Sequence, residues 1–293
     1  MLRSLLFLPG NKPNMLIHAA SLGADAVIFD LEDAVSPAEK DAARILVRNT
    51  MRYSDLSRCA VIVRINGADT DFWKKDLDAI LPEKPAMILL PKAALPASVE
   101  EVSDYMSALE ARLGLAEGSV GLMPLIETAL GVENSFAIAS LTRVRALFLG
   151  AEDLTADLRC KRTKEGKEIE YARQRLVVAA RAAGKEVFDT PFTDVNDDEG
   201  IYADAAFAKS LGFSGKAAIS PRHVEAINET FCPTAEEIEY ASEVIEAMRL
   251  AKERGLGAVS LKGKMIDAPI LARAEQTLAA AVALGLHRED CDE

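Results

Sequence analysis

Two apolar runs of strand length in the middle of the chain are each followed by acidic residues. The first run leads into Glu127, and the second into Glu152 and Asp153. The segment between them, roughly Glu133–Leu141, is helix-like, and a strand, a helix and a strand predict two parallel neighbouring strands. Such strands lie about 4.8 Å apart, so the acids meet at one sheet edge. Two carboxylates there suit a divalent cation such as Mg²⁺. The alternative is that they cap the following helices.

Charged residues also stand at the ends of other apolar runs. Asp30, Glu32 and Asp33 follow the second run, in FDLEDAV, and Arg64 ends the third, VIVRI. Three acids within four residues repel each other unless a cation lies near; the alternative is a structural Asp30 with a helix cap at Glu32 or Asp33. Burying a guanidinium without a partner is costly. We therefore expect Arg64 either to bind a substrate carboxylate or oxyanion or to pair with these acids.

Lys92 and Asp267 each allow two interpretations. Lys92 follows the fourth run, where a lysine is able to form an imine with a carbonyl substrate. Nearby carboxylates would keep its amine protonated, so we expect a charge-balancing role instead. Asp267, in KGKMIDAP, has the spacing of a helix N-cap, with proline two residues later. No histidine ends a strand, so neither a histidine metal triad nor a Ser-His-Asp set is predicted. The histidines are His18, His223 and His287.

The elements that would position these residues are eight strand-like runs in the first 220 residues, each followed by a helical pattern. Alternating strands and helices predict parallel βαβ units, and eight of them favour a (β/α)8 TIM barrel, an α/β fold, over an open doubly wound sheet. Catalytic residues of such a barrel lie just after its strands; Asp189 and Arg222 follow the last two runs. The predicted strands are Ser4–Leu8, Ala26–Phe29, Ala60–Ile65, Ala86–Leu90, Val120–Ile126, Ala146–Leu149, Glu186–Phe188 and Lys216–Ile219.

The chain beyond about residue 232 is a separate part. Thr234 and Glu237 predict a capping box at the start of a helix over Ala235–Arg254. We expect a catalytic domain over residues 1–232 and a helical extension over residues 233–293, packed on its own barrel or on a neighbouring subunit. The other predicted elements of the extension are a β-hairpin turning at Lys262–Lys264 and a helix over Ile270–Leu284.

The composition excludes some classes of partner. The hydrophobic fraction of 49% and the charged fraction of 27% are ordinary for a globular protein. The net charge of −12 argues against nucleic acid or an anionic membrane as the main partner, although not against an anionic substrate. The four cysteines form no Cys-x-x-Cys pair, which fits a reducing compartment. The first apolar run is too short for a signal peptide or a membrane span, so we expect a cytoplasmic protein.

Seven motifs, in order along nearly the whole chain, resemble the citrate lyase beta-subunit and malyl-CoA lyase group of the HpcH/HpaI aldolase superfamily. Together the motifs are highly specific, although PLIET or VRING alone would be weak. They are RSLLFLPGNKP near the start, FDLEDAV at Asp30, VRING at Arg64, PLIET at Glu127, GAEDLTAD at Asp153, SPRH at His223 and GKMIDAP at Asp267.

The resemblance implies a TIM barrel that assembles as trimers or hexamers. It implies that Glu127 and Asp153 hold Mg²⁺ and that Arg64 grips an oxo or hydroxy acid. It also reverses the interpretation of Asp267, because in the malyl-CoA lyase branch this aspartate enters the active site of an adjacent subunit and moves a proton at the acetyl carbon. The implied reaction is cleavage of a 3-hydroxy-3-carboxyacyl thioester to a 2-oxo acid and an acyl thioester.

This chemistry suits the residue types. Mg²⁺ would chelate the carboxylate and hydroxyl of the substrate, Arg64 would stabilise developing charge, and Asp267 would protonate the enolate carbon. The hydroxyl proton would pass to a carboxylate of the Asp30–Asp33 cluster, which includes Asp30 and Glu32, or to a metal-bound water. The remaining expected substrate contacts are Glu127, Pro9, Gly10 and Lys12.

The thioester carrier and the oxo acid stay open. A citrate lyase subunit proper acts on an acyl-carrier-protein thioester in a multi-subunit complex, whereas a free-standing relative uses CoA, and glyoxylate, pyruvate and oxaloacetate differ by small groups. The charged segment 159–168 is expected to be a solvated loop, with contact to CoA phosphates as the alternative. A thioesterase and a non-catalytic assembly subunit are further alternatives; finding Glu127, Asp153, Arg64 and Asp267 together argues against the latter.

Overall fold

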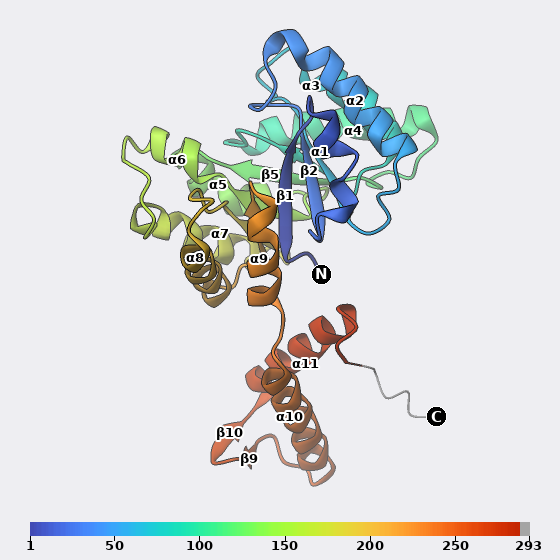
Figure 1. Cartoon of the computed structure of the whole chain (residues 1–293). Coiled ribbons are helices and arrows are strands. Elements are labelled where there is room, and N and C mark those ends of the chain that lie inside the picture. Colours follow the sequence, from blue (N-terminus) through green and yellow to red (C-terminus); the bar gives the residue numbers. More distant parts are fainter. Residues whose placement is uncertain (288–293) are drawn as a thin grey trace. The chain divides into compact units, whose positions relative to one another are not determined.

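The computed structural model describes residues 1–287, so Cys291 lies outside the described residues. The chain divides into two compact units, residues 2–229 and the residues from 230 onward. The first unit is a closed barrel in which eight strands, β1 to β8, follow one another in chain order and pair in parallel. Helices surround the strands (Figure 1). The prediction of a TIM barrel is confirmed.

Each of the eight predicted strands is present and agrees with its expected bounds to within one residue. Continuous apolar runs define them because a parallel barrel strand is covered on both faces. The strands are β1 (Ser4–Pro9), β2 (Ala26–Asp30), β3 (Ala60–Arg64), β4 (Met87–Leu90), β5 (Gly121–Ile126), β6 (Ala146–Leu149), β7 (Glu186–Asp189) and β8 (Gly215–Ala218).

The helix expected over Glu133–Leu141 begins four residues earlier than expected. Thr128 is the reason, because its side chain accepts a hydrogen bond from the Gly131 N–H at 3.0 Å and caps the helix. The helices of the barrel unit are α1 (Pro13–Leu16), α2 (Lys40–Tyr53), α3 (Trp73–Ile80), α4 (Pro96–Leu113), α5 (Ala129–Ala139), α6 (Ala151–Asp157), α7 (Glu170–Ala182), α8 (Asp198–Leu211) and α9 (Val224–Phe231).

The interior of the barrel is filled by inward-pointing apolar side chains. Burying one of them completely stabilises the fold by about 1.5–3 kcal/mol. Because these side chains fill the interior, it is a packed core and not a pore, and a substrate can bind only at the ends of the strands. Pairing of β1 with β8, with Leu5 opposite Ala217, closes the barrel. The inner cluster includes Leu5, Ile28, Ile62, Leu89, Met123, Leu125, Phe148, Phe188 and Ala217.

The second unit contains α10 (Ala235–Glu253), α11 (Ala268–Ala283) and a two-stranded hairpin. The capping box is confirmed, since the Thr234 hydroxyl accepts from the Glu237 N–H and the Glu237 carboxylate accepts from the Thr234 N–H. The unit has a small apolar core of its own. Its buried members are Ala241, Val244, Ile266 and Ala274.

The hairpin of the second unit is also confirmed. Its strands are β9 (Val259–Leu261) and β10 (Lys264–Ile266), paired antiparallel. Lys262 and Gly263 form the turn with φ of 50° and 78°, the left-handed conformation that two-residue hairpin turns require.

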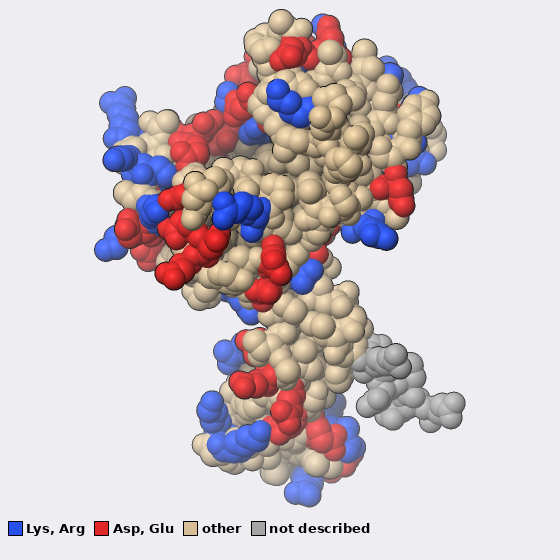
Figure 2. Space-filling model, in the orientation of Figure 1, with Lys and Arg blue, Asp and Glu red and all other residues tan. Residues whose placement is uncertain are grey.

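The exterior of the barrel unit carries charges of both signs. Figure 2 shows acidic and basic side chains interspersed over its visible face, in a chain whose net charge is −12. Within residues 1–287, no helix is both long and apolar enough to cross a membrane.

Candidate active site

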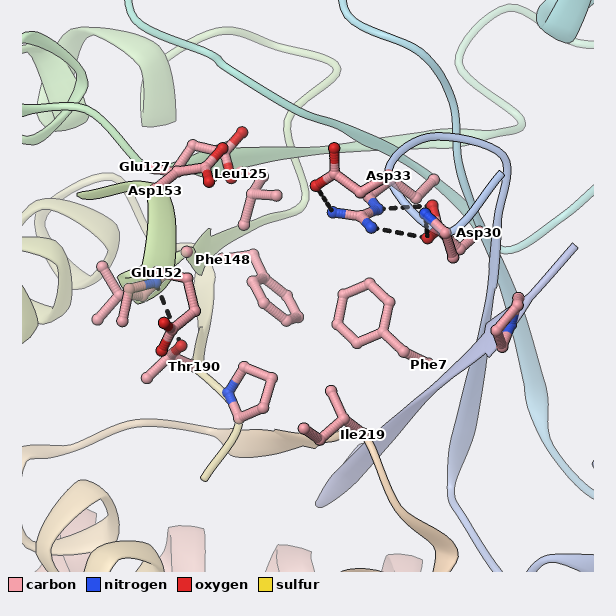
Figure 3. A pocket seen from close by; sticks show the side chains of 17 residues that line it. Phe7, Asp30, Asp33, Leu125, Glu127, Phe148, Glu152, Asp153, Thr190 and Ile219 are labelled. Carbon is pink, nitrogen blue, oxygen red and sulfur yellow. Dashed lines mark hydrogen bonds and ion pairs between the residues drawn. The ribbon is translucent and has the colours of Figure 1, made fainter. Parts of the chain in front are cut away.

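A cavity of about 450 Å³ lies at the carboxyl ends of the barrel strands. Figure 3 shows its two sides: Glu127 and Asp153 lie next to each other, with Asp33 and Asp30 across from them, and the rings of Phe7 and Phe148 face the space below. The polar lining residues are Asp30, Asp33, Arg64, Glu127, Glu152, Asp153 and Thr190. The apolar lining residues include Phe7, Leu125, Phe148, Leu149, Pro191 and Ile219.

Glu127 follows β5 directly and is only 5% exposed. Its Oε1 accepts a hydrogen bond from the Lys92 N–H at 2.6 Å. Burial raises the pKa of Glu127, the Lys92 N–H lowers it, and the neighbouring Glu32 and Asp153 carboxylates raise it further, to about 8. The helix-capping alternative is wrong for this residue, because Thr128 caps the next helix. Glu127 is thus a buried carboxylate whose charged form is disfavoured by burial and by two neighbouring acids more than the Lys92 N–H and Arg64 favour it.

Asp153 lies in the first turn of α6 and is exposed at the cavity. The structure therefore brings Glu127 and Asp153 together, as expected from their positions after adjacent strands. Asp153 makes no cap hydrogen bond, and Gly150 occupies the N-cap position. The neighbouring Glu152 carboxylate instead lies 3.6 Å from the Arg162 guanidinium.

Gly150 leaves the room that Glu127 occupies. A Cβ atom at Gly150 would lie 2.7 Å from both Cβ and Oε2 of Glu127, and 3.1 Å from the Leu125 side chain. The backbone of Gly150 is in the extended region, with φ of −102°, so other residues could adopt its conformation. Space, rather than backbone freedom, is the reason for glycine at this position.

These residues fit a magnesium ion. The carboxylates of Glu127 and Asp153 lie together at the cavity, and carboxylate oxygens are the ligands that Mg²⁺ prefers. In the part of the chain that the structure describes, no group of three or more histidine, cysteine or acidic side chains could hold a metal by itself. Mg²⁺ usually takes one or two carboxylates and keeps its other positions for water and substrate, so the pair Glu127 and Asp153 suits it.

Arg64 ends β3 and makes the contacts of a buried ion pair. Its Nε and Nη2 each donate to Asp30 at 2.7 Å, and Nη1 lies 3.0 Å from Glu32 and 3.5 Å from Asp33. Burial would lower the pKa of Arg64, but Asp30 and then Glu32 and Asp33 outweigh burial and raise it. The ion pair expected as the alternative is therefore present, and Arg64 lines the cavity as well. Its guanidinium carbon lies 5.1 Å from the centre of the Phe7 ring.

Asp30 and Glu32 differ in how fully they are bonded. Asp30 Oδ1 accepts from the Glu32 N–H and from Arg64, and Oδ2 accepts from the Ala34 N–H and from Arg64. Glu32 Oε2 lies 3.0 Å from Arg64 Nη1 but accepts no hydrogen bond of good geometry. Burial raises the pKa of Glu32, Arg64 lowers it, and the neighbouring acids raise it further, to about 7. Glu32 is buried beside Arg64 and does not belong to the lining of the cavity.

Lys92 has the surroundings of a charge-balancing residue. Its Nζ lies 3.8 Å from Glu32 Oε1. Burial would lower the pKa of Lys92, but Glu32, Asp69, Asp33 and Asp153 raise it. A protonated amine is a poor nucleophile, and this favours the charge-balancing interpretation over an imine.

The residues after β1 are only partly at the cavity. Pro9 lines it, whereas Gly10 and Lys12 do not. The Gly10 N–H donates to the Asp30 carbonyl at 2.8 Å, and a Cβ at Gly10 would lie 2.6 Å from that oxygen. Gly10 therefore allows the close approach that fixes Asp30, and Lys12 is an exposed residue just before α1.

Asp267 belongs to the second unit, immediately before α11. It has the N-cap position that its spacing predicts, but its side chain caps nothing. Asp267 is half-buried, and its carboxylate makes no hydrogen bond or ion pair with any described residue. The side chain is thus free for another role.

The segment 159–168 pairs many of its own charges. Arg162 lies 2.8 Å from Glu168, and Lys164 lies 2.6 Å from Asp194 and 3.0 Å from Asp197. Through Arg162 the segment also reaches Glu152 at the edge of the cavity. Most residues of the segment are exposed, as expected of a solvated loop.

Asp189 is not in the ring of catalytic strand ends to which sequence reasoning assigned it. It is fully buried and pairs with Arg173 at 2.9 Å and with Lys216 at 2.7 Å. Asp204, on α8, completes this buried group of two acids and two bases. The sequence contains one signal that indicates this buried group: Lys216 lies inside a short apolar strand, and a buried ammonium group requires an acidic partner.

A closed parallel barrel with a carboxylate-rich cavity at its strand ends is the architecture of a TIM-barrel enzyme. Residues 3–221 match the family described as HpcH/HpaI aldolase/citrate lyase. The chain belongs to this family, and the resemblance found in the sequence is confirmed.

Several relatives match along most of their length. The citrate lyase subunit beta of Leuconostoc mesenteroides subsp. cremoris is 42% identical over 94% of this chain and 92% of its own. A (3S)-malyl-CoA thioesterase of Cereibacter sphaeroides is 35% identical over 96% of this chain and 95% of its own. Among solved structures, the protein CitE of Mycobacterium tuberculosis in complex with magnesium, acetoacetate and coenzyme A has a TM-score of 0.78 and 31% identity, and the match covers 96% of this chain and 98% of that one.

Proposed function

We propose that this protein is a Mg²⁺-dependent carbon–carbon lyase. Its substrate is a 3-hydroxy-3-carboxyacyl thioester, and its products are an acyl thioester and a 2-oxo acid. The observation that carries the proposal is the meeting of Glu127, Asp153 and Arg64 at one cavity, which offers two carboxylates for a metal and a cation for an anionic substrate. A relative crystallised with magnesium, acetoacetate and coenzyme A supports the same cofactor and substrate classes.

Glu127 and Asp153 are the residues that would hold the ion. Mg²⁺, when bound, supplies Lewis-acid chemistry at the carboxylate and hydroxyl oxygens of the substrate. Arg64 orients the substrate and stabilises negative charge on the departing oxo acid. Asp30 positions Arg64, because its two oxygens are both occupied by the guanidinium and by backbone N–H groups.

A carboxylate of the Asp30–Asp33 cluster is the base that removes the hydroxyl proton. In this cluster both Asp30 oxygens are occupied, Glu32 Oε2 lies 3.0 Å from Arg64 Nη1 outside the cavity lining, and Asp33 lines the cavity. When the hydroxyl loses its proton, its oxygen becomes the carbonyl of the 2-oxo acid, the carbon–carbon bond breaks, and the electron pair of that bond passes to the α-carbon of the acyl thioester, which becomes an enolate. The apolar wall around Phe7 and Phe148 keeps water from this carbon until it is protonated at the intended position.

Asp267 of a neighbouring subunit then protonates the enolate carbon. Support comes from its free carboxylate, which stands at an N-cap position and caps nothing. The proposal requires an oligomer, a trimer or hexamer, in which the unit beginning at residue 230 closes the active site of the next copy. Light scattering of the purified protein tests the assembly, and a monomer with full activity would contradict this role.

A complementation experiment tests whether Asp267 acts across subunits. Asp267→Asn and Arg64→Ala should each be nearly inactive, and dissociating and reassembling them together should restore activity. In a mixed oligomer, some sites combine an intact Arg64 with an intact Asp267 from the other variant. Mixing that restores nothing, with mixed oligomers present, would show that both residues act from one chain or that Asp267 has no part.

The thioester carrier defines a second candidate function. A citrate lyase beta subunit acting on a citryl acyl-carrier protein is favoured by the 42% identity with the Leuconostoc subunit. A thioesterase that releases free acids is favoured by the match to the malyl-CoA thioesterase. The three reactions differ in their products: an oxo acid and an acyl-CoA, an oxo acid and an acyl thioester of the carrier protein, or free CoA and a free hydroxy acid without carbon–carbon cleavage.

One screen separates these candidates. The purified protein, with Mg²⁺, is incubated with malyl-, citramalyl- and citryl-CoA and with citryl acyl-carrier protein, and the oxo acid and free CoA are measured. We expect oxo acid from at least one thioester and its loss on adding a chelator. If no thioester is cleaved while Mg²⁺ binds normally, the lyase proposal is wrong. Free CoA without oxo acid would establish the thioesterase instead.

A further inference from the structure

Helix α6 carries Asp153 but lacks a cap from its own chain segment. The first N–H groups of a helix have no partner within it, and a Ser, Thr, Asp or Asn at the N-cap normally supplies one. Gly150 holds the N-cap position. A side chain there would collide with Glu127, whose Oε2 lies 2.7 Å from the Cβ position. The space that Glu127 needs therefore excludes the usual capping residues.

Thr190 supplies the missing acceptor from the next strand. Its Oγ1 accepts a hydrogen bond from the Ala151 N–H, the first of α6, at 3.2 Å. Thr190 directly follows β7, is 2% exposed and lines the cavity. Figure 3 shows Thr190 beneath Glu152, joined to the start of α6 by a dashed line.

Thr190 is itself held by buried charges. Lys216 Nζ donates to the Thr190 carbonyl at 2.7 Å and to Asp189 at 2.7 Å. Arg173 donates to both oxygens of Asp189, to Oδ1 at 3.0 Å and to Oδ2, which Lys216 also contacts, at 2.9 Å. Lys216, Asp189 and Arg173 are fully buried, so the position of Thr190 is fixed by groups that cannot rearrange without exposing or unpairing a charge.

We propose that Thr190 is a positioning residue for the metal site: its hydroxyl fixes the first turn of α6 and thereby holds Asp153 beside Glu127. The inference rests on the proposed function, because it takes Asp153 as a Mg²⁺ ligand. Residues that orient metal ligands typically change metal affinity by about 10–100-fold when replaced. The hydroxyl of Thr190 has this role, because it is the group that accepts from the Ala151 N–H.

The experiment compares Mg²⁺ binding to the purified full-length protein by calorimetry. Thr190→Val keeps the shape and removes the acceptor, and we expect Mg²⁺ affinity about tenfold weaker. Thr190→Ser keeps the acceptor and should bind within about twofold of the parent. Thr50→Val, the same change at a buried position of α2, is the matched control and should leave affinity unchanged. Hydrogen exchange of the Ala151 amide gives a readout that does not depend on metal, and it should accelerate in Thr190→Val alone.

Asp153→Asn serves as the reference for the metal site. If Asp153→Asn weakens Mg²⁺ binding but Thr190→Val does not, the inference about Thr190 is wrong and the proposed function stands. If Asp153→Asn leaves binding unchanged, the metal assignment beneath both fails. Should Thr190→Val not fold, Thr190→Ala and Thr190→Ser replace it, and equal affinity in those two variants overturns the role of the hydroxyl.

Discussion

Replacing Gly150 by alanine tests the metal site through steric contact alone. The backbone of Gly150 already has φ of −102°, which alanine adopts without strain. The added Cβ would lie 2.7 Å from Cβ and from Oε2 of Glu127, whereas carbon atoms pack at about 3.5–4.0 Å. Glu127 must therefore move by about 1 Å, since the backbone of β5 behind it is packed in the barrel core.

A displacement of this size is large for a metal ligand. Mg²⁺ requires oxygens at about 2.0–2.1 Å in nearly ideal octahedral geometry, and a misplacement of about 1 Å costs about 100-fold in rate. We expect Gly150→Ala to fold, with about 1–3 kcal/mol lost to overpacking, and to lose about 100-fold in kcat/KM together with a marked loss of Mg²⁺ affinity.

Calorimetry with Mg²⁺, a thioester cleavage assay and thermal unfolding measure the three effects. Gly257→Ala is the matched control, because a Cβ at Gly257 meets nothing within 4 Å and its φ is not positive. The control should keep Mg²⁺ binding and activity. If Gly150→Ala binds Mg²⁺ and turns over within about twofold of Gly257→Ala, Glu127 is not held where the ion binds, and the reasoning fails.

Three further variants test other parts of the structure. Asp153→Ala should abolish Mg²⁺ binding without changing the melting temperature by more than a few degrees, and unchanged affinity in calorimetry would contradict the ligand assignment. Arg64→Lys loses the paired hydrogen bonds to Asp30 and should reduce kcat by about 100-fold at unchanged Mg²⁺ affinity; equal loss of both would indicate a structural role. Glu110 is a buried residue of α4. Burial alone would raise the pKa of its carboxyl group, but hydrogen bonds from Arg143 and from two backbone N–H groups outweigh burial and lower this pKa from 4.5 to about 2. The stability from this group is complete above pH 4.5 and is lost as the pH falls toward 2, so Glu110→Gln should cost about 3–5 kcal/mol at pH 7 and progressively less on acidification; a pH-independent cost in denaturant titrations would refute the assignment.

The fold was predictable because its signal is local and repeated. Each strand is a short apolar run, and each is followed by a helical pattern, so eight independent observations agree on one architecture. The meeting of Glu127 and Asp153 was predictable for the same reason. In a parallel barrel the carboxyl ends of all strands lie on one face, and the positions in the sequence then determine which side chains are neighbours.

The hydrogen bonds and ion pairs of the individual acidic side chains were harder to predict from the sequence. FDLEDAV contains three acids, and nothing local distinguishes Asp30, which is saturated by Arg64 and backbone N–H groups, from Glu32, whose Oε2 accepts no hydrogen bond of good geometry. Asp189 was assigned to the catalytic face because it ends a strand. Its carboxylate points instead to Arg173 and Lys216, and these partners come from an outer helix and from the interior of another strand.

Gly150 shows why contacts between distant positions cannot be predicted from the local sequence pattern. By itself, a glycine before a short helix indicates a turn, and a threonine forty residues later indicates nothing. In the structure, the volume of Glu127 excludes a side chain at position 150, the missing side chain leaves the Ala151 N–H without a local acceptor, and Thr190 accepts from it at 3.2 Å. Glu127, Gly150 and Thr190 follow three different strands, and the residue type at each position depends on the residue at another. The three positions can therefore be interpreted only together, once the barrel has brought β5, β6 and β7 side by side.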